Sequence, residues 1–230
     1  MNIDLFNLLT DTMKLDPQSF SGKTIVITGA GRGIGFQTAR AYAMLGGRVI
    51  LAECSDEGIE AESVIRDEGG TAHFIRTDVS SASSVAALAE HTGKFYGSID
   101  VLVNNAIYIQ QASVLETSLE MWEKTIAVNL RGTFLTCRAF APQMLEAGRG
   151  TILNMVSTDA MPGLSAYMAS KQAITGFSQT LAMELDQSGV NVIPFGPGMV
   201  DTPGIRQIAA GLAPRLGLSP DQFLNLSLHA

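Results

Sequence analysis

The chain has 230 residues, of which 46% are hydrophobic and 16% charged, and its formal net charge is −7. This composition excludes an intrinsically disordered chain, and the length suffices to bury a full hydrophobic core. The negative charge argues against a nucleic-acid-binding protein, which usually presents a basic surface. No apolar run approaches the ~20 residues of a membrane span, so we expect no membrane partner and a cytoplasmic location.

Residues 1–21 are predicted to form a helical extension. They lack the basic start of a secretory signal. Leu5, Phe6, Leu8 and Leu9 fall near helical spacing. This spacing is typical of an amphipathic helix that packs on the body of the protein or on a partner subunit.

From residue 22 onward, short β-branched runs alternate with longer stretches of helical periodicity, such as residues 36–47 and 84–97. Strands alternating with helices predict βαβ units, and therefore a parallel sheet with helices on both faces. We expect residues 22–230 to form one doubly wound α/β domain. The predicted strands are residues 23–28, 48–53, 72–78, 99–105, 150–157 and 191–197.

Each of these runs ends in polar or turn-forming residues, and any one of them alone is compatible with a simple strand end. In an open parallel sheet, however, ligands bind beyond the carboxyl ends of the strands. The series therefore predicts a shared crevice. Its members are Thr28-Gly29, Glu53, Asp78, Asn104-Asn105, Ser157 and Pro197-Gly198.

The segment TGAGRGIG (28–35) follows the first predicted strand and opens a helix. Its glycines do not have the G-x-G-x-x-G spacing of the dinucleotide fingerprint. They nevertheless permit positive φ angles and let the backbone approach a pyrophosphate, whose charge rests on the helix N-terminus. The strand–turn–helix context therefore predicts a nucleotide site.

Glu53 ends the second predicted strand, about 20 residues after the glycines, where a carboxylate accepts hydrogen bonds from ribose hydroxyls and repels a 2′-phosphate. This position favours NAD as the cofactor. Arg32 argues the other way, because a guanidinium in the turn can pair with that phosphate, unless it is a solvated loop residue. NADP therefore stays the alternative.

With these residues in place, the chain resembles the short-chain dehydrogenase/reductase family in its shorter, single-domain type. The resemblance implies a Rossmann-type three-layer sandwich with strand order 3-2-1-4-5-6, a nicotinamide cofactor, and reversible oxidation of an alcohol to a carbonyl. It runs from about Gly22 to Pro203 and is highly specific in combination. The matching elements are TGAGRGIG, TDVS (77–80), NNA (104–106), Asn129 in AVNLRG, Ser157, YMASK (167–171) and PGMVDTP (197–203).

The resemblance also implies roles for single residues. Asp78 would contact the adenine region, Asn105 would line the cofactor cleft, and Thr202 would lie near the nicotinamide carboxamide. The residues expected to be catalytic are Asn129, Ser157, Tyr167 and Lys171. Those expected to bind the cofactor are Thr28, Gly29, Gly31, Arg32, Gly33, Ile34, Gly35, Glu53, Asp78, Val79, Asn105, Ala106, Tyr167, Lys171, Pro197, Gly198, Val200 and Thr202.

Three features depart from the family pattern. Ile107 replaces the glycine that usually follows NNA. The segment from Ser157 to Tyr167 is a few residues shorter than usual, which makes Thr158 an alternative catalytic hydroxyl. After Gly204 the chain lacks the further helix and seventh strand that are usual in the family. We therefore expect the sixth strand to be a candidate exposed edge.

Tyr167 and Lys171 lie four residues apart, so both would point from one helix face into the crevice. Free tyrosine has a pKa of about 10, and a unit charge ~4 Å away contributes about 4 kcal/mol at an effective dielectric near 20. We therefore expect the Lys171 ammonium, helped by the positive charge of an oxidised nicotinamide, to lower the pKa of Tyr167 toward neutrality.

In the predicted mechanism, Ser157 holds the substrate oxygen, Tyr167 takes or gives its proton, and hydride passes between the substrate carbon and the nicotinamide. Asn129 would bond a backbone carbonyl or a water that connects Lys171 to solvent. The structural alternatives are a serine that merely ends a strand and an asparagine that caps or kinks a helix.

Cysteine and histidine give no sign of a metal site. Cys54 and Cys137 are expected to be buried free thiols in a reducing cytosol. His73, His91 and His229 have no carboxylate or cysteine at ligand spacing. No metal is therefore expected.

The leading interpretation is an oxidoreductase that transfers a hydride between NAD(H) and a small alcohol or ketone. The alternative is a nucleotide-binding protein of the same type with little or no turnover, because its short C-terminus leaves the cleft open. A sugar-nucleotide epimerase fits less well, since the glycine spacing differs and a sizeable substrate domain is lacking. From the family we also expect a homodimer or homotetramer, formed through helices at about 118–147 and 165–188.

Overall fold

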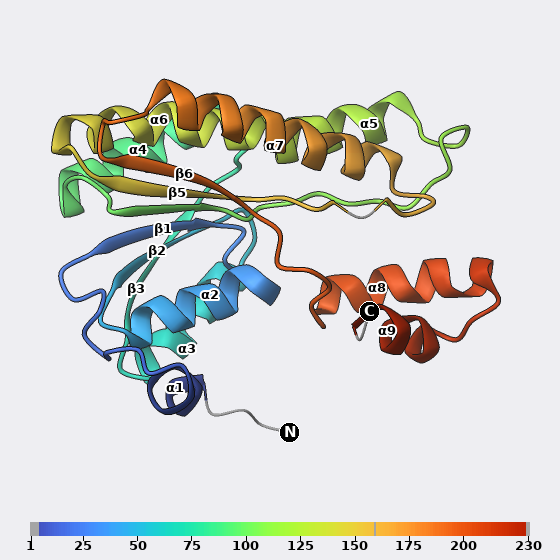
Figure 1. The fold of residues 1–230 in the computed structure, drawn as a ribbon, viewed down its shortest axis with the longest axis horizontal. Helices are drawn as coiled ribbons and strands as arrows, with labels where there is room; N and C mark the ends of the chain where they lie inside the picture. The colour runs from blue at the N-terminus through green and yellow to red at the C-terminus, as the bar shows by residue number, and fades with distance from the viewer. Residues whose placement is uncertain (1–4, 159, 229–230) are drawn as a thin grey trace.

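The computed structural model describes residues 5–158 and 160–228. Over these residues the chain forms a six-stranded parallel sheet with the order β3-β2-β1-β4-β5-β6, the middle layer of three in Figure 1. The doubly wound arrangement and the strand order agree with the prediction. The strands are β1 (Thr24–Thr28), β2 (Arg48–Glu53), β3 (Thr71–Arg76), β4 (Val101–Asn104), β5 (Gly150–Met155) and β6 (Val190–Phe195).

Helices α4, α6 and α7 cover one face of the sheet, and α2 and α3 cover the other over β1 to β3 (Figure 1). The helices are α1 (Leu5–Asn7), α2 (Gly33–Met44), α3 (Glu57–Asp67), α4 (Ala82–Tyr96), α5 (Leu119–Thr125), α6 (Gly132–Ala147), α7 (Ser165–Glu184), α8 (Pro203–Leu212) and α9 (Pro220–Leu228). No helix in the described part of the chain is long and apolar enough to cross a membrane.

The central strands β1, β2 and β4 are nearly continuous apolar runs because both faces of the sheet are buried there. Successive side chains point to opposite faces, and β1 divides accordingly. Ile25 and Ile27 pack in the cluster on the α2 side, whereas Val26 packs with Phe140 and Met144 of α6 on the other side. Two separate cores therefore hold the sheet rigid beneath its carboxyl edge.

The long helix predicted at 118–147 is interrupted. Between α5 and α6 the chain forms a π-helical segment, Ile126–Arg131, which carries the buried Asn129. Such segments are frequent at functional sites. In the N-terminal extension, helical conformation covers only Leu5–Thr12, with Leu9 buried, and residues 1–4 lie outside the described part.

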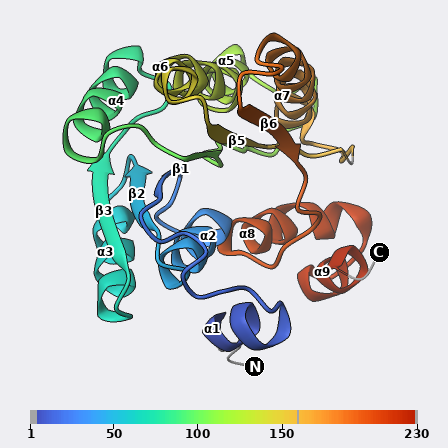
Figure 2. The ribbon, with the colours of Figure 1, turned by 60° about the vertical axis from the view of Figure 1, so that its left-hand side comes forward.

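Helices α8 and α9 lie beyond the carboxyl end of β6, on the α2 side of the sheet (Figure 2). They pack on each other through their own small apolar cluster rather than through the two main cores. The Gln111 side chain ties α8 to the body by donating to the Ile208 carbonyl at 2.7 Å. This pair of helices therefore stands at the edge where the sequence predicts a ligand.

Candidate active site

The glycine turn at 28–35 is packed closely against the segment that follows β4. Gly29 and Gly33 have φ angles of +64° and +58°, which L side chains rarely adopt. A Cβ on Gly29 would lie 2.7 Å from the Ala106 Cα, and one on Gly35 would collide with the Gly29 carbonyl oxygen. The turn therefore requires glycine at these positions for its own shape.

Thr28 and Asn105 hold this turn in place. The Asn105 side-chain amide donates to the carbonyls of Thr28 and Gly29 at 3.0 and 2.9 Å. The Thr28 hydroxyl accepts from the backbone N–H groups of Asn105 and Ala106, both at 3.0 Å. The side-chain amide of Asn105, a residue predicted to line the cleft, thus supports the glycine turn.

Helix α2 begins at Gly33, and its N-cap residue Arg32 makes no capping hydrogen bond, since an arginine side chain has no acceptor. A cavity of about 630 Å³ opens between this helix start and the segment leading into α8. Exposed N–H groups at a helix start attract phosphate, so the turn fits a pyrophosphate. The cavity is lined by Gly31, Arg32, Gly33, Ile34, Val200 and Thr202 among the predicted cofactor residues.

Glu53 lies at the carboxyl end of β2 and reaches the same turn. Its Oε1 accepts from the N–H groups of Cys54 and Ser55 at 2.8 and 3.0 Å, and its Oε2 accepts from Gly31 N–H at 3.3 Å. These bonds fix a negative charge beside the glycine turn. Arg32 is largely exposed and lies 3.5 Å from a Glu57 oxygen, which agrees with a solvated loop residue.

The prediction of two buried thiols was wrong for one of them. Both cysteines are free, but only Cys137 is buried, whereas Cys54 is exposed. The reason is position, because Cys54 is the first residue beyond β2 and turns out of the sheet at its carboxyl edge. Its thiol donates to Glu53 Oε1 at 3.3 Å. Desolvation by partial burial, followed by the nearby Glu53 charge, raises its pKa.

The remaining predicted cofactor residues also gather at the carboxyl edge. Asp78 follows β3 and accepts from the Ser80 N–H and hydroxyl at 2.9 and 2.7 Å. Val79 is buried, and a Cβ on Gly132 of α6 would lie 2.9 Å from it. Beyond β6, Gly198 turns the chain with a φ of +71°. Pro197 precedes it, and Thr202 caps α8 by accepting from the Ile205 N–H.

Ser157 and Tyr167 meet above β5. Ser157 follows the strand, and Tyr167 lies in the first turn of α7. Burial raises the pKa of Tyr167, and a hydrogen bond between its phenol and the Ser157 side chain opposes that effect. Thr158, the alternative hydroxyl, is exposed. The phenol and the Ser157 hydroxyl therefore form a pair that can hold one oxygen atom between them.

Lys171 is buried on the same face of α7, with only 3% of its surface exposed. Its ammonium donates to the Met155 carbonyl at 2.6 Å and lies 5.7 Å from the centre of the Tyr167 ring. Burial lowers its pKa to about 8. The predicted lowering of the Tyr167 pKa by Lys171 was therefore wrong for this arrangement, because the ammonium is directed at the strand carbonyl and burial dominates the phenol.

Asn129 is 1% exposed and bonds a backbone carbonyl, one of the two contacts expected for it. Its amide donates to the Tyr108 carbonyl at 3.1 Å and to the Ser170 hydroxyl at 3.0 Å, and its oxygen accepts from Tyr108 N–H at 2.7 Å. Tyr108 and Ser170 were missed in the sequence. For Ser170 a signal existed, since it lies three residues after Tyr167 and thus near the same helix face.

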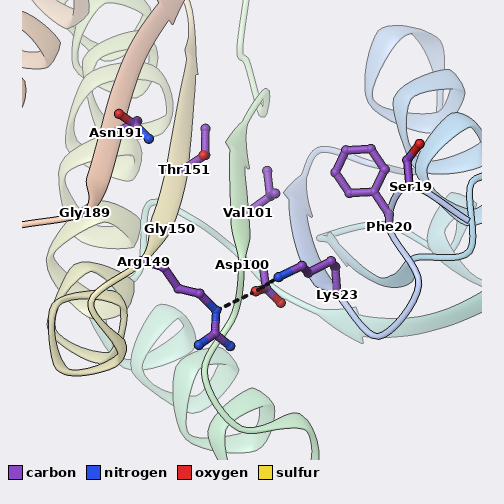
Figure 3. A pocket seen from close by; sticks show the side chains of 10 residues that line it. All are labelled: Ser19, Phe20, Lys23, Asp100, Val101, Arg149, Gly150, Thr151, Gly189 and Asn191. Atoms are coloured by element: carbon purple, nitrogen blue, oxygen red, sulfur yellow. Dashed lines mark hydrogen bonds and ion pairs between the residues drawn. The ribbon is translucent and has the colours of Figure 1, made fainter. Parts of the chain in front are cut away.

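A second cavity lies at the opposite, amino edge of the sheet, with a volume of about 310 Å³ (Figure 3). At its base Asp100 pairs with Lys23 at 3.1 Å and with Arg149 at 3.2 Å. Val101 and Thr151 form part of its wall. This ion cluster lies at the end of the sheet away from Tyr167. Parallel sheets bind ligands at the carboxyl ends of their strands, so the cluster is not at the edge expected for a ligand.

Among residues 5–158 and 160–228, no group of three or more His, Cys, Asp or Glu side chains could hold a metal ion. His229 lies outside these residues.

The family model of short chain dehydrogenases matches residues 23–212 of the chain. The chain belongs to the short-chain dehydrogenase family. A D-threitol dehydrogenase from Mycolicibacterium smegmatis is 41% identical over 185 residues, 79% of this chain and 71% of that one. A metagenomic short-chain oxidoreductase solved with NADP is 37% identical, with a TM-score of 0.75, covering 79% of this chain and 85% of that chain. A NAD⁺-bound xylitol dehydrogenase is 29% identical, with a TM-score of 0.80, covering 85% and 77%. By its family, this short-chain dehydrogenase is therefore an oxidoreductase.

Proposed function

We propose that the protein transfers a hydride between NAD(H) and a small alcohol or ketone at the Ser157–Tyr167–Lys171 group. One observation carries the proposal. Ser157 and Tyr167 contact each other at the carboxyl edge of β5, where α7 begins. The nearly fully buried Lys171 lies one helical turn further along α7. A buried ammonium beside a phenol is costly to maintain in a fold, and such perturbed groups cluster at functional sites.

Each of these side chains has a chemical role in the proposal. Ser157 donates its hydroxyl to the substrate oxygen and holds it beside Tyr167. Tyr167 takes the proton from an alcohol, or returns one to the alkoxide formed from a carbonyl. Lys171, when charged, can donate hydrogen bonds to ribose hydroxyls. The nicotinamide dinucleotide, when bound, accepts or supplies the hydride.

Asn129, in the segment between α5 and α6, supports the proposed site without contacting the reacting groups. Its amide and carbonyl hold Tyr108 and Ser170 rather than a reacting atom. We assign it to positioning the segment after β4 against α7.

NAD is the proposed cofactor because Glu53 places a fixed carboxylate beside the glycine turn. The backbone N–H groups of Gly31, Cys54 and Ser55 hold this carboxylate in place by hydrogen bonding to its oxygens. A 2′-phosphate there would meet like charge. The two structural relatives were solved with NADP and NAD⁺ respectively, so the choice rests on Glu53.

The test is a turnover assay with purified protein. NADH and NADPH absorbance would be followed with a panel of polyols, including D-threitol and xylitol, and with simple ketones. The polyols head the panel because two relatives are named for them. We expect turnover with NAD(H) and loss of it in the Tyr167→Phe variant. Dinucleotide binding without turnover across the panel would instead support the alternative of a binding protein.

We also propose that the protein forms a homodimer or homotetramer through α6 and α7. Phe134 on α6 and Met183 on α7 are 42% and 80% exposed. Exposed large apolar side chains on adjacent long helices are typical of subunit contacts. Light scattering of the wild type and of a Phe134→Glu/Met183→Glu double variant tests this, with a smaller mass expected for the variant. A wild-type monomer would refute it.

A further inference from the structure

Ser170 has a contact pattern that the proposed chemistry does not use. It is completely buried, and its hydroxyl makes two hydrogen bonds. It donates to the Tyr167 carbonyl at 2.6 Å and accepts from the Asn129 amide at 3.0 Å. A serine hydroxyl carries one donor and two acceptor sites. In Ser170 the donor is used, and a residue from another element occupies one of the two acceptor sites.

This hydroxyl joins three segments that lie far apart in sequence. Asn129 sits in the π-helical segment between α5 and α6, and it clasps Tyr108 of the segment after β4 through both its N–H and its carbonyl. Ser170 extends that clasp into the first turn of α7, at the peptide group of Tyr167 itself. The turn carrying the phenol is therefore anchored to the neighbouring helix layer as well as to its own helix.

The side chains of Tyr167 and Lys171 have their partners on and after β5 instead. The Lys171 ammonium reaches Met155 of β5, and the Tyr167 phenol reaches Ser157. Ser170 thus fixes the backbone of the turn while its neighbours face the strand. A displacement of about 1 Å at a reacting group can cost on the order of 100-fold in rate.

We infer that Ser170 is a positioning residue, which holds the Tyr167 turn in register with Ser157 by bridging Asn129 to the Tyr167 carbonyl. The inference rests on the proposed function of the Ser157–Tyr167–Lys171 group. It differs from a role in stability, because its consequence is the geometry of the phenol rather than the strength of helix packing.

The same helix supplies a matched control. Ser178, two turns further along α7, is also completely buried, donates to the Ile174 carbonyl at 2.7 Å and accepts from the Asn154 amide at 2.9 Å. Its surroundings and bonding repeat those of Ser170, but no reacting group lies beside it. Ser170→Ala and Ser178→Ala should therefore lose similar stability, and only the first should alter the chemistry.

The first measurement compares kcat and KM for the best substrate of the panel, together with the thermal midpoint of unfolding. We expect kcat to fall about tenfold or more in Ser170→Ala with the KM for NADH unchanged, and to stay within about twofold in Ser178→Ala. Equal losses of kcat in the two variants, or a change only in the unfolding midpoint, would overturn the inference. Ser170→Cys, which keeps the volume but bonds weakly, should follow Ser170→Ala and serves if the alanine variant does not fold.

A second measurement does not depend on turnover. The chain has four tyrosines, so the titration of Tyr167 can be isolated as the difference in tyrosinate absorbance between each protein and its Tyr167→Phe counterpart. Lys171 is the charged group facing this ring, and Ser157 is its polar partner. Because burial raises the pKa of Tyr167 and the Ser157 bond opposes that effect, a loosened turn should raise the pKa further in Ser170→Ala only. An unchanged Tyr167 pKa in Ser170→Ala would contradict the inference, whether or not the wild type turns over. Absence of turnover in the wild type would contradict the proposed function instead.

Discussion

The two edges of the sheet differ in whether they stabilise the charged form of a titratable side chain. At the amino edge, burial alone would raise the pKa of Asp100, but hydrogen bonds from the Thr24 N–H, Lys23 and Arg149 outweigh it and lower the pKa. At the carboxyl edge, the Lys171 ammonium has a carbonyl as its hydrogen-bond partner, and burial lowers its pKa to about 8. The fold stabilises the first charge and disfavours the second.

This difference separates a structural charge from a functional one. The cluster around Asp100 ties the start of β1, the start of β4 and the turn before β5 together. Lys171 contributes nothing comparable to the fold, since a buried lysine costs free energy whenever it is charged. Groups held in an unfavourable state are expected where chemistry needs them. The predictions below test this contrast.

The largest effect is expected for Tyr167→Phe. Removal of the phenol oxygen eliminates the proton transfer, and turnover should fall by about 1,000-fold or more. Dinucleotide binding should persist, because Tyr167 lies outside the glycine turn. Steady-state rates and NADH fluorescence titration measure the two quantities.

The control for that change is Tyr96→Phe, which removes a phenol oxygen from α4, far along the chain from α7. It should leave turnover unchanged. Near-normal turnover in Tyr167→Phe would show that the proton is handled elsewhere, and the carboxyl edge would lose its assigned chemistry.

Lys171→Met should lower activity and raise stability together. Turnover should fall by about 100-fold or more, since general acid–base groups contribute effects of that size. Below pH 8 the wild type keeps a charged lysine buried, so the variant should be more stable at pH 7, by about 1 kcal/mol or more. The folded pKa of about 8 lies below the unfolded value of about 10.4, so wild-type stability rises with pH across this window and the advantage of the variant shrinks.

Urea unfolding at pH 7 and at pH 10 measures this difference. Lys94→Met, which removes an exposed lysine from α4, should change neither turnover nor the pH dependence. If Lys171→Met were instead less stable than the wild type at pH 7, Lys171 would be a structural residue like those at the amino edge.

The sequence predicted the fold well because the centre of the sheet is buried on both sides. The central strands β1, β2 and β4 are therefore apolar runs, and at the edge the predicted run 72–78 corresponds to β3 at Thr71–Arg76. The glycine turn, Glu53 and the meeting of Ser157 with Tyr167 were also accessible, since each sits at a strand end or on a helix face that the pattern fixes.

What the sequence did not reveal depends on contacts between distant segments. The direction of the Lys171 ammonium is set by the Met155 carbonyl, and the role of Asn129 is set by Tyr108, which lies on a separate segment. Cys54 is exposed because β2 ends one residue before it, at Glu53. The π-helical break in the predicted helix at 118–147 has no marker in its apolar periodicity.

A smaller effect, on cofactor choice, is expected at Glu53. Glu53→Gln removes the fixed charge beside the glycine turn and weakens hydrogen bonds to the ribose hydroxyls. The ratio of kcat/KM for NAD to that for NADP should fall by about tenfold to 100-fold. Rates with both cofactors at fixed ionic strength give this ratio.

Glu57→Gln is the matched control, because the half-exposed Glu57 carboxylate pairs with the Arg32 guanidinium and not with the backbone N–H groups that Glu53 binds. In Glu57→Gln the ratio of kcat/KM for NAD to that for NADP should change by less than about twofold. If the NAD-to-NADP ratio of kcat/KM were unchanged in Glu53→Gln but changed in Arg32→Ala, the Arg32 guanidinium rather than Glu53 would determine cofactor choice.

The smallest effect on activity is expected at Asp100, where turnover should stay within about twofold of the wild type because the residue lies at the other edge of the sheet. Asp100→Asn should nevertheless destabilise the fold by about 1–2 kcal/mol at pH 7, since it removes the negative charge that Lys23 and Arg149 share and replaces one of the two acceptor oxygens by an NH2 donor. The folded pKa of Asp100 is depressed, so its contribution is present above the unfolded value of about 3.9 and is lost as pH falls through the folded pKa. Urea unfolding of both proteins at pH 7 and pH 3 should therefore show a difference that narrows in acid. A loss of turnover without a loss of stability would mean that the two edges are coupled, and the contrast between a structural and a functional charge would not hold.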